Sequence, residues 1–131
     1  MEESQLKLKI RYEMELAYGS RNGGNEGRAR VCARRAAGWA INRLRSDWAE
    51  REDLGSAYDS LRWLQQQSTA SDTVRAAATR LTTRLTPEHE LPFSQDPLLD
   101  AERVIRFVFA QDWRGFPRSS GAGRPSAGDT S

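Results

Sequence analysis

Arginine is concentrated in one short stretch of the sequence, GRARVCARRAAGWAINRLR, which spans residues 27–45. The planar guanidinium group binds phosphate and carboxylate equally well, so the cluster predicts either a nucleic-acid site or a set of ion pairs. In the nucleic-acid interpretation the arginines contact phosphates, while Trp39 and Trp48 lie close enough in sequence to stack on bases. The six candidate nucleic-acid-binding residues are Arg28, Arg30, Arg34, Arg35, Arg43 and Arg45.

Few other residues in the sequence are of types that carry out chemistry. Cys32 is the single cysteine and His89 the single histidine, so we expect no disulfide within the chain and no metal site. No nucleophile motif that could serve serine chemistry accompanies His89. We therefore expect no cofactor. Four residues separate Arg84 from His89 in the sequence.

A helical projection of residues 27–45 separates alanines from arginines. At about 100° per residue, one arc of the helix contains small apolar side chains and no arginine. The members of this arc are Ala29, Ala33, Ala36, Ala37, Ala40 and Leu44. The projection favours a helix that packs on its alanines, with arginines along the edges. Because residues 47–59 and 87–112 are net acidic, ion pairing within the fold is the alternative to a nucleic-acid site.

The elements that must position these residues are helices. Capping residues and apolar spacing predict helices over 26–46, from about Ser56, over 72–85 and from Asp96 onward. Together with an N-terminal helix, they make residues 1–112 an all-α bundle of four or five helices. Residues 113–131, rich in Gly, Pro and Ser with three arginines, predict a disordered tail. Since no apolar run approaches the roughly 18 residues of a membrane span and no signal-peptide core is present, we expect a cytoplasmic protein without a membrane partner.

The N-terminal segment is compatible with two secondary structures. Residues 6–16 alternate apolar and charged side chains, which is the period of a strand. However, they are mostly helix formers and no hairpin partner follows, so we favour a helix. That helix is apolar on two sides, one made by Leu6, Ile10, Met14 and Ala17 and the other by Leu8, Tyr12 and Leu16. Such a helix is either central in its bundle or shared with a second chain.

A small helical chain with the Arg84 and His89 spacing near its last helix resembles the HEPN superfamily, a group of helical bundles that includes metal-independent ribonucleases of toxin and antiviral systems. The resemblance implies a dimer that cleaves RNA, with Arg84 stabilising phosphate charge and His89 handling a proton. The stretches NEGRARVCARRAAG, ELPF and DAERVI are also similar to short helical bacterial proteins with no assigned activity. The alternative for His89 is a surface loop, because Pro87 and Pro92 interrupt the backbone.

These observations lead to two functional expectations. The first is a non-enzymatic interaction protein that self-associates as a dimer or docks to a larger protein. The second is a HEPN-like RNA-binding protein or ribonuclease of a toxin or defence system. The predicted interface residues for the first are Leu8, Tyr12, Leu16, Ala29, Ala33, Ala36 and Ala40.

Overall fold

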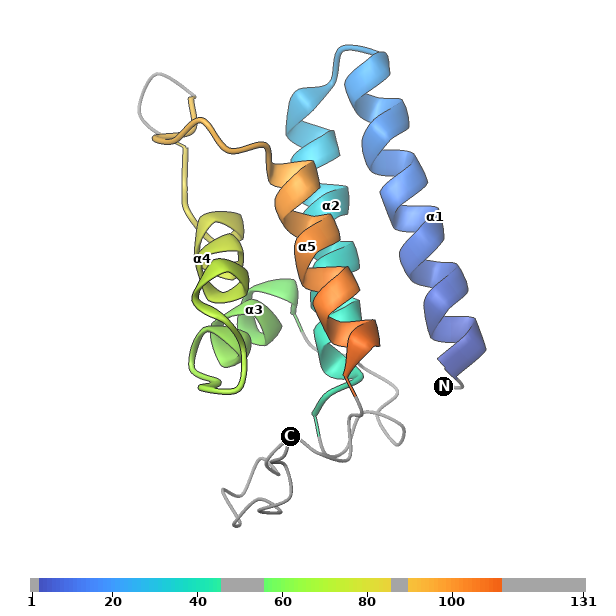
Figure 1. The fold of residues 1–131 in the computed structure, drawn as a ribbon. Helices are drawn as coiled ribbons and strands as arrows, with labels where there is room; N and C mark the ends of the chain where they lie inside the picture. Colours follow the sequence, from blue (N-terminus) through green and yellow to red (C-terminus); the bar gives the residue numbers. More distant parts are fainter. Residues whose placement is uncertain (1–2, 46–55, 86–89, 112–131) are drawn as a thin grey trace.

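The computed structural model describes residues 3–45, 56–85 and 90–111. Within these ranges all regular structure is helical, and Figure 1 shows the arrangement. The helices are α1 (Glu3–Asn22), α2 (Glu26–Asn42), α3 (Ala57–Gln65), α4 (Asp72–Leu81) and α5 (Pro97–Ala110). The predicted all-α bundle is therefore confirmed. The predicted tail, residues 113–131, lies outside the described residues.

Four helices begin at a residue whose side chain accepts a hydrogen bond from the first turn. Asn25 caps α2, Ser56 caps α3 and Ser71 caps α4. Asp96 caps α5, which has Pro97 in its first turn. These caps satisfy backbone N–H groups that have no partner within the helix, which explains why the helix starts were predictable from the sequence.

Helix α2 is the centre of the bundle. It packs against α1, α3 and α5, whereas α4 packs against α3 and α5 (Figure 1). The alanines of its predicted arc have no exposed surface, because α1 and α5 cover them. The prediction that Ala29, Ala33, Ala36 and Ala40 form an interface with another chain is therefore corrected: they form the contacts between helices of the same chain.

Helix α1 confirms the helical interpretation of the N-terminal segment and lies at the edge of the bundle. Leu6, Ile10 and Ala17 are buried against the rest of the fold. On the opposite side, the side chains of Leu8 and Tyr12 are each 60% exposed. The helix that is apolar on two sides is thus not the central one. Of its second apolar side, Leu8 and Tyr12 face outward, whereas Leu16 is partly buried against the core.

Two contacts define how the helices join. After helix α1 ends at Asn22, the chain turns at Gly24, whose φ of 88° favours glycine, and the N–H of Asn25 donates to the carbonyl of Ser20. Near the α1 C-terminus, Tyr18 donates a hydrogen bond to Glu102 of α5. Burial and this bond raise the pKa of Tyr18 to about 12. The turn at Gly24 and the bond between Tyr18 and Glu102 hold α1 in place beside α2 and α5.

Helix α4 is shorter than predicted, ending at Leu81 instead of extending to residue 85. The hydroxyls of Thr82 and Thr83 both donate to the carbonyl of Thr79. In a continuing helix this carbonyl would instead accept a hydrogen bond from the backbone N–H four residues later. The chain therefore leaves the helix before Arg84 and runs past the N-terminal half of α2.

Candidate functional site

A cavity of about 590 Å³ lies among the N-terminal half of α2, the start of α3, the C-terminal end of α4 and residues 91–97. Four of its lining residues are arginines, namely Arg30, Arg34, Arg80 and Arg84. We call it the arginine pocket. Tyr58, Thr82 and Thr83 contribute polar groups to its walls. The pocket combines two sets of residues that the sequence suggested separately, the arginines of α2 and Arg84.

Arg34 is a half-buried cation that forms no ion pair with any residue in the described ranges. Burial lowers the pKa of its guanidinium, and the nearby charges of Arg30 and Arg35 lower it further. A cation that is partly removed from water beside other cations is held at a cost in free energy. An anion placed against Arg34 would remove that cost, so the arrangement favours an anionic ligand.

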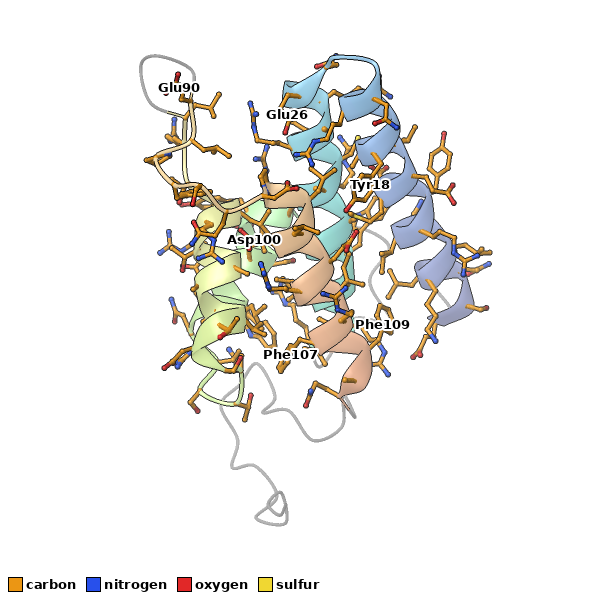
Figure 2. The ribbon with its side chains drawn as sticks, turned by 45° about the horizontal axis from the view of Figure 1, so that its top comes forward. Tyr18, Glu26, Glu90, Asp100, Phe107 and Phe109 are labelled. Carbon is orange, nitrogen blue, oxygen red and sulfur yellow. The ribbon has the colours of Figure 1, made fainter. Side chains whose placement is uncertain are left out.

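Arg80 differs from the other arginines of the pocket because it forms an ion pair. Its Nε and Nη2 atoms donate to the two carboxylate oxygens of Asp100 at 2.8 and 2.9 Å. Asp100 is fully buried on the side of α5 that faces α4, and it also accepts a hydrogen bond from Arg103 (Figure 2). These bonds raise the pKa of Arg80. Arg80 therefore joins α4 to α5, and its position in the pocket is set by this pair.

Arg30 and Arg84 have no ion pair of their own in the described part of the chain. The charge of Arg30 contributes to lowering the pKa of Glu26, but the hydrogen bonds to that carboxylate come from Arg21 at 3.0 and 2.6 Å. Arg84 is exposed at the rim of the cavity. Together with Arg34, they leave three guanidinium charges around one concave site.

The neutral walls of the pocket have limited hydrogen-bonding freedom. The hydroxyls of Thr82 and Thr83 already donate to Thr79. Tyr58 is 48% exposed, and its hydroxyl accepts a hydrogen bond from Arg62 at 2.9 Å. The polar contacts of an anion would therefore come mainly from the arginines, while the ring of Tyr58 offers a flat surface beside them.

The remaining arginines of the predicted nucleic-acid surface lie elsewhere. Arg35 pairs with the buried Glu13 at 3.2 Å. Arg43 is buried, pairs with Glu3 at 3.1 Å and donates to the carbonyls of Val108 and Gln111. Arg43 is thus unavailable to a nucleic acid, because it satisfies the last turn of α5.

Two further members of that predicted surface are also outside the pocket. Arg28 is exposed beside Glu15 and Leu16 of α1. Arg45 is half-buried and donates to Asn42 at 3.4 Å. The predicted six-arginine surface is therefore divided, and only Arg30 and Arg34 share one site.

The structure describes only one residue of the predicted catalytic pair. Arg84 lines the pocket, whereas His89 lies outside the described residues, as does Trp48. Trp39 is half-buried under the Nζ atom of Lys9, 4.8 Å from its ring centre, and does not line the pocket. The structure thus tests neither the proton-transfer role of His89 nor base stacking by Trp48.

Sequence reasoning missed Arg80 and Tyr58 as pocket residues. The repeat TRLTTRLT over residues 79–86 places Arg80 and Arg84 four positions apart, which was a signal for a shared site. No comparable signal marked Tyr58, because its position depends on how α3 packs on α2.

No protein-family model matches this chain, and neither a curated protein nor a solved structure matches it. The resemblance to the HEPN superfamily accordingly stays a prediction. Among the described residues, no helix is both long and apolar enough to cross a membrane, and no group of three or more metal-binding side chains comes together.

Proposed function

We propose that this protein binds RNA in the cytoplasm by holding phosphate in the arginine pocket. The observation that carries the proposal is Arg34, a half-buried guanidinium without a carboxylate partner in the described ranges. Arg30 and Arg84 line the same cavity and add to its positive charge. Such a concentration of cations attracts phosphate, which supplies most of the affinity in nucleic-acid binding.

The arrangement favours a single strand over a duplex. A duplex presents phosphates along an extended surface and needs cations spaced along it. Here Arg35 and Arg43 are engaged with Glu13 and Glu3, whereas Arg30 and Arg34, which have no ion pair in the described residues, line one cavity. A flexible single strand can bend a phosphate and its base into that cavity.

Fluorescence anisotropy with a labelled single-stranded RNA at two salt concentrations tests the proposal. We expect wild-type binding to weaken with salt, and Arg34→Met to weaken it at least about tenfold, as loss of a phosphate contact in a confined site predicts. The matched control is Arg106→Met, because Arg106 is 69% exposed on α5 and does not line the pocket. Equal weakening by both variants would show a general charge effect, and absence of binding would overturn the proposal.

Cleavage is a separate question that the same samples answer. Running each reaction on a denaturing gel, with His89→Ala as the control, tests the predicted roles of Arg84 and His89 in proton transfer and charge stabilisation. Cleavage that is lost in His89→Ala would make the protein a ribonuclease. Intact RNA with unchanged affinity in that variant would make it a non-enzymatic RNA-binding bundle.

A second candidate function is self-association through the outer side of α1. It rests on Leu8 and Tyr12, two large side chains one turn apart that are 60% exposed on an edge helix. Light scattering tests it with Leu8→Glu, and Leu99→Glu is the control, since Leu99 is a 45% exposed leucine on α5. A dimer mass that falls only in Leu8→Glu supports this function, whereas a monomeric wild-type protein excludes it.

The fully buried position of Ala36 makes it unsuitable for that experiment. A larger side chain at Ala36 would push α2 away from its neighbours inside the chain, so it would report on folding and not on assembly.

A further inference from the structure

We propose that the arginine pocket receives a phosphomonoester, the phosphate group at the end of a nucleotide or RNA strand, with the adjoining base against the ring of Tyr58. The inference rests on the proposed function and makes it more specific. It concerns which phosphate of the ligand enters the pocket.

The charge of the pocket favours a monoester over the diester of a continuous strand. Arg30, Arg34 and Arg84 have no ion pair in the described residues and line one cavity. A phosphodiester carries a single negative charge, whereas a phosphomonoester carries about −1.5 to −2 near neutral pH and offers three terminal oxygens. The doubly charged group balances more of the cationic charge and accepts more guanidinium hydrogen bonds.

The fourth arginine does not change this balance. Arg80 is paired with Asp100, which is fully buried and bound through both carboxylate oxygens. The side chain therefore forms a fixed wall. Both carboxylate oxygens of Asp100 accept hydrogen bonds from Arg80, and one also accepts from Arg103. These bonds offset the negative charge of Asp100, which would otherwise repel an anion in the pocket.

The shape of the pocket points in the same direction. The cavity of about 590 Å³ is lined from four parts of the chain, α2, α3, the end of α4 and residues 91–97. This volume is within the range of about 300–1,000 Å³ that small-molecule pockets occupy. A cavity of this size accommodates a mononucleotide or the terminal nucleotide of a strand.

Tyr58 supplies the contact for the base. Its ring is 48% exposed where α3 begins and belongs to the same cavity as the arginines. Arg62, one turn along α3, binds the Tyr58 hydroxyl and lies 5.7 Å from the ring centre, so the ring is held in place. Aromatic rings bind bases of any sequence by stacking, so this contact adds affinity for the nucleoside without selecting one base.

The experiment compares one RNA sequence in three forms, with a 5′-phosphate, with a 3′-phosphate and with hydroxyls at both ends. Affinities are measured by anisotropy for wild type, Arg34→Met and the control Arg106→Met. We expect a phosphorylated end to bind at least about tenfold tighter than the hydroxyl form, and this preference to disappear only in Arg34→Met.

Two smaller probes identify the source of the phosphate and the role of the ring. Adenosine monophosphate and inorganic phosphate are used as competitors, and Tyr58→Leu is compared with Tyr12→Leu, which removes an exposed ring on α1. We expect adenosine monophosphate to compete better than inorganic phosphate, and only Tyr58→Leu to reduce this difference. Equal competition by both anions would overturn the stacking role of Tyr58.

The outcomes separate this inference from the RNA-binding proposal. If all three RNA forms bind equally and Arg34→Met weakens them all, RNA binding stands and the phosphomonoester inference fails. If adenosine monophosphate binds in an Arg34-dependent way while no RNA binds, the phosphomonoester is that of a free nucleotide and the RNA proposal fails. If nothing binds, both fail.

Discussion

The two sides of helix α2 use the same residue type in different ways. On the side of α1, Arg35 and Arg43 meet the carboxylates of Glu13 and Glu3. On the side of α3 and α4, Arg30 and Arg34 meet further arginines, a tyrosine and two threonines around the arginine pocket. The paired arginines join helices to one another. Arg30 and Arg34 gain no stabilisation from an ion pair in the described residues. Charged side chains that a fold holds in this way are typical of binding sites.

The comparison also shows that the neighbouring helix determines whether an arginine of α2 forms an ion pair. Positions 34 and 35 are adjacent in α2, yet within the described ranges only Arg35 pairs with an acidic residue, Glu13. Because successive helical positions point about 100° apart, adjacent residues face different neighbours. Substitutions on one side of α2 at a time measure what each side contributes to stability and to binding.

The largest expected effect comes from Asp100→Ala at the wall of the arginine pocket. The change leaves Arg80, whose side chain is only 20% exposed, without its carboxylate, and we expect the free energy of unfolding to fall by about 3 kcal/mol. Urea denaturation followed by circular dichroism measures it. The control is Asp72→Ala, because Asp72 is 97% exposed in its ion pair with Arg75 and should matter little. Similar losses in both variants would contradict a special role for the buried pair.

The next effect concerns the close contact of α2 with α3. A Cβ atom added at Gly38 would lie 2.6 Å from the Cα atom of Ala57, so the helices must separate in Gly38→Ala. We expect a loss of about 2 kcal/mol in urea denaturation and weaker RNA binding, since Tyr58 follows Ala57 into the pocket.

Gly19→Ala is the control for that change, because nothing lies within 4 Å of a Cβ atom at Gly19 in α1. It should raise stability by up to about 1 kcal/mol through helix propensity. A stable Gly38→Ala variant with unchanged RNA affinity would show that α3 moves without disturbing the pocket.

A third effect is the pH dependence of stability that arises from the ion pairs of Arg21. Arg21 binds Asp96 and Glu26, and these hydrogen bonds lower the pKa of both carboxyls. Groups with a lowered pKa stabilise the fold above their unfolded pKa, near 4, and lose that contribution as pH falls through the lowered folded value. Wild-type stability should therefore decline below about pH 4.

Arg21→Met should remove part of this acid dependence. We expect it to lower the free energy of unfolding by about 1 kcal/mol at pH 7, since all three side chains are partly exposed, and by less at pH 2.5. Urea denaturation at the two pH values gives both numbers. A loss that is as large at pH 2.5 as at pH 7 would mean that Arg21 acts by packing and not by charge.

The smallest expected change in stability comes from Arg34→Met, which we compare with Arg35→Met at the adjacent position. Arg35→Met leaves Glu13, whose side chain is 8% exposed, without its partner and should lower stability by about 1 kcal/mol. Arg34→Met removes a half-buried charge that has no ion pair in the described residues, so stability should be unchanged or slightly raised. Thermal unfolding with and without RNA distinguishes the two, because only Arg34→Met should lose the stabilisation by RNA. A marked loss of stability in Arg34→Met alone would assign it a structural role.

The helices and their starts could be predicted from the sequence because their causes are local. Asn25, Ser56, Ser71 and Asp96 cap within three residues of their own position, and the alanine arc of α2 follows from the helical period. The composition of the N-terminal segment favoured helix over strand for the same reason. The end of α4 was predicted too late, because the two threonine hydroxyls compete with the backbone there.

The use of each arginine was decided only by the tertiary structure. The sequence by itself determined that α2 carries arginines beside an alanine packing face, and that Arg84 lies near the C-terminal end of another helical segment, predicted over residues 72–85. It could not determine that Arg43 would be buried against the end of α5 or that Arg34 and Arg84 would line the same cavity, because both depend on segments distant in sequence. Charge pairing acts over a few ångströms in space, so the choice between an ion pair and an anion site belongs to the packed bundle.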